Sequence, residues 1–225
     1  MAAGGARRSP GRAGSGAGPT RADGPPPRTR SARERVLDVV VELLERGGEA
    51  AVRVDTVRDS SGVSVGSIYH HFHDRDGLIV AGQVRRFARF AEAEIAALSE
   101  IVQRAADREA FRRAIRSMTL LASSELRVAE RWARVAVLGS TVGRPGLEEE
   151  IRRLQTRLTD EFQAHVAQGQ ARGFFRSDLD ARAVALFVEA YSLGRALDDL
   201  NDRAVTDEKW EQVVWAALEG LLVTD

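Results

Sequence analysis

Three histidines lie close together in the chain, at positions 70, 71 and 73, and imidazoles can bind a transition metal. On a helix, side chains at i, i+1 and i+3 converge poorly on one ion, and the chain has no cysteine to complete a site. Contacts with a binding partner, or packing within the surrounding domain, explain His70, His71 and His73 better. We therefore predict no bound metal and no cofactor.

Carboxylates are also concentrated, at Glu148, Glu149 and Glu150. Acidic side chains in the first turn of a helix interact favourably with its dipole, so we interpret this group as structural. The sequence has no nucleophile elbow, phosphate-binding glycine loop, metal-binding triad or convergent pair of carboxylates. We predict that the protein is not an enzyme, and turnover of a bound compound would contradict this.

A different chemistry, the reading of DNA, is indicated closer to the N-terminus. The pattern predicts short helices over residues 54–60 and 64–71, joined by a three-residue turn. Gly62 gives that turn its backbone freedom, Val63 is an apolar contact after it, and Ser64 is a good N-cap. Two short helices joined in this way are typical of a helix-turn-helix.

The second short helix has the side chains that a recognition helix needs. Small or polar groups would face the edges of the bases, while Ile68 and Phe72, at i and i+4, would face inward. The residues predicted to face outward are Ser64, Val65, Gly66, Ser67, Tyr69 and His70.

A longer helix precedes this pair and would support it. Ser31 and Glu34 form a capping-box pattern at its start, and Gly47-Gly48 predicts its end. Apolar residues recur between them at helical spacing and give the helix one face to bury: Val36, Val39, Val40, Leu43 and Leu44.

Residues 62–72 read Gly-Val-Ser-Val-Gly-Ser-Ile-Tyr-His-His-Phe, and Asp-Arg-Asp-Gly-Leu follows at 74–78. This sequence resembles the signature of the TetR-like repressor family, and the resemblance covers about residues 33–78. It implies an all-helical homodimer, with the second helix of the helix-turn-helix in the major groove of double-stranded DNA and an effector pocket in the C-terminal helices.

The resemblance also implies which residues touch DNA. The family's base-reading positions correspond to Val65, Gly66, Ser67 and Tyr69, and its phosphate-contacting positions to Tyr69, His71 and Arg75. For Arg75 there is also a physical reason to expect a phosphate contact, because a guanidinium beside the free amides of a helix N-terminus suits phosphate.

Two residues depart from the family pattern. Arg53 stands where the family usually has a threonine that caps the first short helix, so Asp55 or a frayed start would have to substitute. Arg53 could add a phosphate contact of its own. Arg58 stands where the family usually has an alanine, which puts in question how tightly the two short helices pack.

The charge is unevenly distributed along the chain. Residues 1–30 hold six arginines against one acid, a net charge of +5, and five of the six prolines, so we expect them to be disordered. Residues 31–75 carry a net charge of −2, although DNA affinity depends on neutralising phosphates. We expect Arg28 and Arg30 of this basic arm to make up the deficit; the alternative is a solubilising tail.

Beyond residue 75 the pattern is helical throughout. It predicts helices over residues 75–103, 107–126, 128–138 and 147–171, with a break at 143–146 and a stop at Gly173. The predicted fold is all-α, a three-helix DNA-binding head followed by a helical bundle. The predicted organisation is a basic arm over residues 1–30, the helix-turn-helix domain over 31–77 and an effector-binding and dimerisation domain over 78–225.

The last two helices carry two apolar stripes, more surface than one neighbouring helix would cover. The family precedent is a dimer interface of four helices, two from each protomer; the alternative is that both stripes are ordinary core. The predicted interface residues are Ala183, Phe187, Ala190, Gly194, Leu197, Trp210, Val214, Trp215, Leu218 and Leu221.

Aromatic and apolar residues of the middle helices could line a ligand cavity, although each of them could equally be core. Such walls would suit a largely apolar or aromatic molecule with one or two polar handles. The candidates are Phe87, Phe90, Phe111, Met118, Trp132, Phe162, Tyr191 and, as a polar group, His165.

The composition sets the class of protein. Of 225 residues 44% are apolar, no apolar run is long enough to span a bilayer, and residues 1–30 lack a signal-peptide pattern, so we expect a soluble cytoplasmic protein without membrane contact. The predicted function is a transcriptional repressor released from a palindromic operator by a small-molecule effector. The alternative is a DNA-binding regulator without an effector, acting through protein partners or as an activator; a body without a cavity would favour it.

Overall fold

The computed structural model describes residues 30–124 and 127–223, apart from the side chain of Ser123. Residues 31–225 form a compact unit of their own. The predicted basic arm, including Arg28, lies outside the described residues except for Arg30, which is exposed.

The regular elements of the described residues are helices, as the sequence predicts, and no strand forms among them. A single isolated bridge pairs Phe175 with Leu222. The elements are α1 (Ala32–Ala51), α2 (Val54–Ser61), α3 (Val65–Phe72), α4 (Arg75–Arg104), α5 (Arg108–Ser123), α6 (Val128–Ser140), α7 (Pro145–Ala171), α8 (Ala181–Gly194), the 3-10 helix η2 (Arg195–Leu200) and α9 (Asp207–Glu219). Within the described part of the chain, no helix has both the length and the apolar character needed to cross a bilayer.

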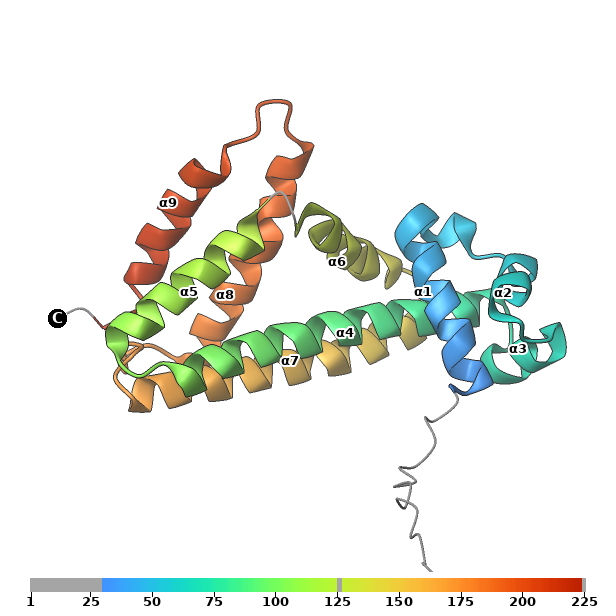
Figure 1. Cartoon of the computed structure of the whole chain (residues 1–225), viewed down its shortest axis with the longest axis horizontal. Coiled ribbons are helices and arrows are strands. Elements are labelled where there is room, and N and C mark those ends of the chain that lie inside the picture. The colour runs from blue at the N-terminus through green and yellow to red at the C-terminus, as the bar shows by residue number, and fades with distance from the viewer. Residues whose placement is uncertain (1–29, 125–126, 224–225) are drawn as a thin grey trace, which may run out of the picture. The chain divides into compact units, whose positions relative to one another are not determined.

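Helices α1, α2 and α3 gather at one end of α4 (Figure 1). The predicted capping box is present, since the Ser31 hydroxyl accepts from the Glu34 amide and the Glu34 carboxylate accepts from the Ser31 amide. The helical dihedrals of α1 are interrupted at Gly47 and Gly48, where the sequence predicts its end. These helices and the start of α4 enclose one apolar cluster, which includes Val36, Val40, Leu44, Val57, Val63, Ile68, Phe72 and Leu78.

The corner between α3 and α4 requires a glycine. Asp74 caps α4, and its carboxylate accepts from the Gly77 amide at 2.7 Å. A Cβ atom at Gly77 would lie 1.9 Å from the carbonyl oxygen of Phe72, so any other residue would collide with the main chain. This close approach holds the recognition-helix candidate α3 directly against the first turn of α4.

Helix α4 packs along α7, and the two run side by side in Figure 1. The C-terminal ends of α4 and α7, together with α5, α8 and α9, enclose the largest of the apolar clusters described. It includes Leu98, Phe111, Phe162, Val166, Phe174 and Leu218. A smaller cluster joins α4, α6 and the start of α7 through Phe87, Val137, Leu147 and Ile151.

The end of α5 differs from the prediction. The sequence pattern extends this helix to Leu126, but the helix ends at Ser123 and Ser124 is extended, with ψ at 158°. A tertiary contact explains the early end, because the Arg131 guanidinium donates to the carbonyl of Ser124 at 2.9 Å and forms a buried bidentate ion pair with Asp199. The Ser124 carbonyl therefore accepts from Arg131 of α6 as well as from the Arg127 amide, at 3.1 Å.

Candidate nucleic-acid interface and its link to the C-terminal helices

The outward face of α3 is built as the sequence predicts. Ile68 and Phe72 are buried, while Tyr69 is 45% exposed. The Ser64 hydroxyl caps the helix by accepting from the Ser67 amide at 3.3 Å. Among the remaining predicted DNA-binding residues of α3 and its cap, Ser64, Gly66, His70 and His71 are exposed and Val65 and Ser67 are half-buried. This face carries little bulk at its start, so a DNA groove could approach its backbone closely.

The histidines do not form a metal site. The rings of His70 and His71 stand edge to face, with centroids 5.2 Å apart, and His73 follows the helix with a positive φ of 67°. Over residues 30–124 and 127–223, no three histidine, cysteine or acidic side chains are placed to hold one ion.

The two departures from the family pattern have different structural outcomes. Arg53 precedes α2 as its N-cap residue without a side-chain cap and is exposed, and its guanidinium makes no hydrogen bond or ion pair with a described residue, so its charge is available to phosphate. Arg58 is exposed and pairs with Asp55 and Asp59 at 3.0 and 2.8 Å. Because Arg58 points to solvent, it does not interrupt the packing of α2 on α3.

Arg75 has a structural role that the sequence did not reveal. Its guanidinium donates to the carbonyl of Val52 at 2.7 Å and to the carbonyl of Glu49. These carbonyls lie at the end of α1 beyond its glycine kink, where the Glu49 carbonyl also accepts from the Val52 amide at 3.2 Å. The predicted phosphate contact of Arg75 would therefore use a guanidinium already oriented by α1.

Glu49 joins the three N-terminal helices to the C-terminal helices. Two nitrogens of the Arg144 guanidinium donate to its two carboxylate oxygens at 2.8 and 2.7 Å. The Ser140 hydroxyl lies 2.7 Å from the same carboxylate, and Gln83 donates to that hydroxyl at 3.0 Å. Arg144 also donates to Asp76 at 3.0 Å. We call these five residues the Glu49 network.

The Glu49 network crosses the predicted domain boundary at residue 77. Glu49 and Asp76 belong to the helix-turn-helix side, and Gln83, Ser140 and Arg144 to the other side. The hydrogen bond from Arg144 is the main reason that the pKa of Glu49 is lowered from its usual 4.5. No spacing in the sequence relates position 49 to position 144, so sequence reasoning missed this contact.

The candidate ligand-lining residues separate into two groups. A cavity of about 290 Å³ between α4 and α6 is lined by Phe87 and Phe90, and an adjoining cavity of about 80 Å³ by Phe90, Met118, Phe162 and Tyr191. Phe111 is instead buried core, stacked on Phe174 with centroids 4.7 Å apart. Trp132 and His165 line neither cavity.

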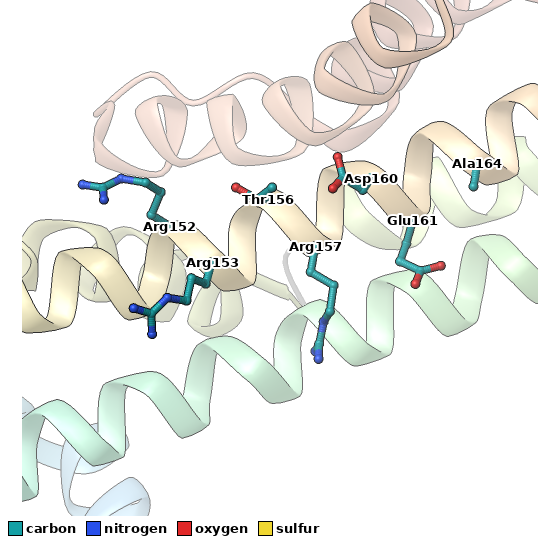
Figure 2. Close-up of a pocket in the computed structure, with 7 residues that line it drawn as sticks. All are labelled: Arg152, Arg153, Thr156, Arg157, Asp160, Glu161 and Ala164. Carbon is teal, nitrogen blue, oxygen red and sulfur yellow. The ribbon is translucent and has the colours of Figure 1, made fainter.

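A further hollow lies on the surface. It measures about 570 Å³ and is lined by α7 alone, from Arg152 to Ala164. Figure 2 shows its side chains standing along one helix, with Arg157 pointing toward α4. Since side chains of a single helix cannot enclose a molecule, we do not treat this hollow as a ligand site.

The predicted interface residues also divide. Val214 and Leu218 are buried in the core of their own protomer, and Trp210, Trp215 and Leu221 pack against that core. The others lie at the surface of the protomer: Ala183, Phe187 and Ala190 of α8 and Leu197 of η2 are exposed, and Gly194 is half-buried. Leu186 of α8 and Val213 of α9 are also exposed, at 48% and 67%.

Residues 36–81 match the family model described as bacterial regulatory proteins, tetR family. Over 60 residues the chain is 35% identical to the transcriptional repressor KstR of Mycobacterium tuberculosis, a match that covers 27% of each chain. The chain thus spans about a quarter to a third of the length of the curated relatives it matches, which are all KstR repressors.

Two solved structures are similar over most of their length. One is a putative TetR-family transcriptional regulator from Rhodococcus sp., with a TM-score of 0.64 and 21% identity over 85% of this chain and 98% of that one. The other is a putative transcriptional regulator from Saccharomonospora viridis in complex with choline, with a TM-score of 0.64 and 22% identity over 86% and 98%. At these identities the likeness is one of fold.

We expect Gly66→Gln to separate folding from DNA binding. A Cβ at Gly66 meets no atom within 4 Å, and replacing a helical glycine should raise stability by up to about 1 kcal/mol. The longer side chain would stand between α3 and the bases, so operator affinity should fall about 10- to 100-fold. Urea unfolding and fluorescence anisotropy measure the two effects. Gly146→Gln, at an exposed glycine of α7 with equally open surroundings, is the matched control and should leave DNA affinity unchanged.

We expect the Glu49 network to make stability depend on pH. Because the pKa of Glu49 is lowered in the folded protein, its contribution is complete above 4.5 and is lost as the pH falls through the lowered value. Glu49→Gln should therefore destabilise the protein near neutral pH, with the difference from wild type shrinking below pH 4.5. Urea unfolding over this range checks it. Glu42→Gln, which removes an exposed pair with Arg46, is the control; a Glu49→Gln difference independent of pH would contradict the expectation.

Proposed function

This chain belongs to the TetR family of bacterial regulatory proteins, and we propose that it is a DNA-binding transcriptional repressor that acts as a homodimer and releases its operator when a small molecule binds. The observation that carries the proposal is the match over residues 36–81, which contains the whole of α2 and α3. The curated relatives that the chain matches are named repressors. Because the protein would act on the chromosome, we expect it in the cytoplasm.

The proposed reading of DNA uses the outward face of α3. Val65, Gly66, Ser67 and Tyr69 would contact bases, and Tyr69, His71, Arg53 and Arg75 would contact phosphates. The capped start of α3, with Gly66 on its outer side, supports a close approach to the major groove. Ser64 and His70 border this surface.

The homodimer is supported by apolar side chains exposed on α8, η2 and α9. Leu197 of η2 is 80% exposed and Val213 of α9 is 67% exposed. Large exposed apolar side chains that gather on a surface are typical of an interaction site. A second copy of the chain would present two α3 helices to a palindrome, which a single head cannot read.

The release step is supported by the cavities and by the Glu49 network. A ligand changes DNA affinity only if it binds two arrangements of the protein with different affinity. Glu45, in the C-terminal half of α1, lines the cavity between α4 and α6, and the Glu49 network connects α1 to the same two helices. One structurally similar regulator is a complex with choline. Cavities of about 290 and 80 Å³ favour this function over a regulator that senses no small molecule and works through protein partners or as an activator.

We expect the full chain to bind a palindrome near its own gene with an affinity that depends strongly on salt. Each phosphate contact contributes about 0.9 to the slope of log affinity against log salt concentration. Replacing Arg28 and Arg30 by glutamine would remove two contacts per protomer and lower the slope by up to about 4 for the dimer. Fluorescence anisotropy at several salt concentrations measures both. Sequence-independent binding would contradict the regulator, and an unchanged slope would make the arm a solubilising tail.

We expect Phe187→Glu to dissociate the dimer. Two like charges brought together at a symmetric interface cost several kcal/mol, so the dimer dissociation constant should rise at least about 100-fold. Sedimentation velocity measures it. Val142→Glu places the same charge on an apolar residue that is 83% exposed, in the turn between α6 and α7, and should leave the dimer intact. If both variants behave alike, the interface lies elsewhere.

A further inference from the structure

The cavity between α4 and α6 is unusual in its charge. Four arginines line it, Arg86 and Arg89 from α4 and Arg127 and Arg134 from the start and middle of α6, against only two acids, Glu45 and Glu130. Its apolar wall is formed by Phe87, Phe90 and Val137 with two alanines. The cavity therefore offers an excess of positive charge beside an aromatic surface.

Two of the four arginines are already neutralised. Arg89 pairs with Asp38 of α1 at 3.0 Å, so its charge is directed away from the cavity. Arg127 pairs with Glu94 at 3.2 Å and with Glu130. Glu130, one of the two cavity acids, is thereby used as well.

Arg86 and Arg134 have no carboxylate partner among the described residues. No ion pair joins either of them to a described residue, and the Nε atom of each is buried without a hydrogen-bond partner. Arg134 lies over the Phe90 ring, with Cζ 4.0 Å from the centroid, and Arg86 donates only to the Gln83 side chain, at 2.9 Å. Buried polar groups are normally satisfied, so two orphaned guanidinium nitrogens in one cavity call for a ligand.

The nearest acids do not supply this partner. Burial lowers the pKa of Arg134 and of Arg86, and Glu94, Glu189 and Glu45 oppose that change only through longer-range attraction. Glu94 is held by Arg127, and Glu189 accepts from Thr159 at 3.2 Å and from Gln155. Both guanidinium groups are thus partly removed from solvent and have no direct counter-ion among the described residues.

We propose that this cavity binds an organic anion, a carboxylate on an aromatic or alkyl body, with its charged group on Arg86 and Arg134 and its body against Phe87 and Phe90. This rests on the proposed function in one respect only, that the anion is the effector. A carboxylate suits the site because two guanidinium groups can each donate to it with charge-assisted hydrogen bonds. The apolar body could continue past Phe90, which also lines the smaller cavity with Met118.

A chain of hydrogen bonds connects the proposed site to the helix-turn-helix side. Arg86 donates to the oxygen of the Gln83 amide at 2.9 Å, and the nitrogen of that amide donates to Ser140 at 3.0 Å. Ser140 in turn lies 2.7 Å from Glu49. An anion that draws Arg86 toward itself would take a donor from Gln83, which is buried, and so disturb the Glu49 network directly.

Three probes that share one ring system and differ only in charge test this assignment: 2-naphthoate, 2-naphthalenemethanol and 2-naphthylmethylammonium. Isothermal titration calorimetry on the full chain should show that 2-naphthoate binds at least about 10-fold more tightly than the neutral alcohol, and that the ammonium binds most weakly. Equal affinities for the three probes, or tighter binding of the ammonium, would overturn the proposal. This comparison uses the wild-type protein and needs no variant to fold.

Variants locate the anion. Arg134→Gln and Arg86→Gln should each weaken 2-naphthoate binding about 10- to 100-fold while leaving the weaker binding of the alcohol nearly unchanged. Arg85→Gln, one residue from Arg86 but outside the cavity wall, removes the same charge and should have no effect on either probe. Circular dichroism melting checks that the variants are folded. If Arg85→Gln weakens 2-naphthoate as much as the cavity variants do, the effect is one of net charge and the site is wrong.

Operator release is read separately, by fluorescence anisotropy with labelled DNA. Arginine-dependent binding of 2-naphthoate without release of the operator would support the anion site and contradict its role as the effector site. Release by the ammonium probe, with no binding of 2-naphthoate, would overturn the anion site and leave the proposed repressor intact.

Discussion

The position of the helix-turn-helix on the rest of the chain depends on how the carboxylate of Glu49 is neutralised. Glu49 follows the glycine kink of α1, and the main chain there is held by Arg75 at the first turn of α4. Its side chain is held by Arg144, from the turn before α7. One short segment is thus fastened on both sides by a guanidinium. A movement of α4 against α6 would change this arrangement, because Gln83 of α4 donates to Ser140 of α6, which in turn donates to the Glu49 carboxylate.

Arginines serve two distinct purposes in this structure, and the difference is visible in what they touch. Arg131 and Arg172 donate to carbonyls at the ends of helices and so fix where those helices stop. These groups are satisfied and have a structural role. Arg53 on the surface, and Arg86 and Arg134 within the body, lack carboxylate partners among the described residues. An unpaired cation is unfavourable for folding when buried, so its presence points to a ligand supplied from outside.

Local signals in the sequence were sufficient for the head. The capping box of α1, the turn at Gly62 and the cap at Ser64 all depend on residues within a few positions of one another, and all are present in the structure; Gly47-Gly48 interrupts α1 as a kink, after which the helix resumes to Ala51. The helices of the body follow equally from periodicity. The end of α5 does not, because it depends on Arg131, which belongs to a different helix. Only part of the apolar stripes that were assigned to an interface lies at the surface of the protomer, because periodicity does not say which side of a helix is covered by the protomer's own core.

The sequence by itself determined the helical class, the helix-turn-helix and the face of α3 that would meet DNA, because helix caps, turns and amphipathic periods are local properties of the chain. Only the tertiary structure decided that Phe111 is core while Phe90 lines two cavities, that Val214 and Leu218 belong to the protomer and Phe187 to its surface, and that Glu49 meets Arg144. Each of these outcomes depends on which residues, far apart in the sequence, lie next to one another in the folded protein. Burial, ion pairing and the lack of a partner are set by these spatial neighbours, so they cannot be read from a residue's position in the sequence.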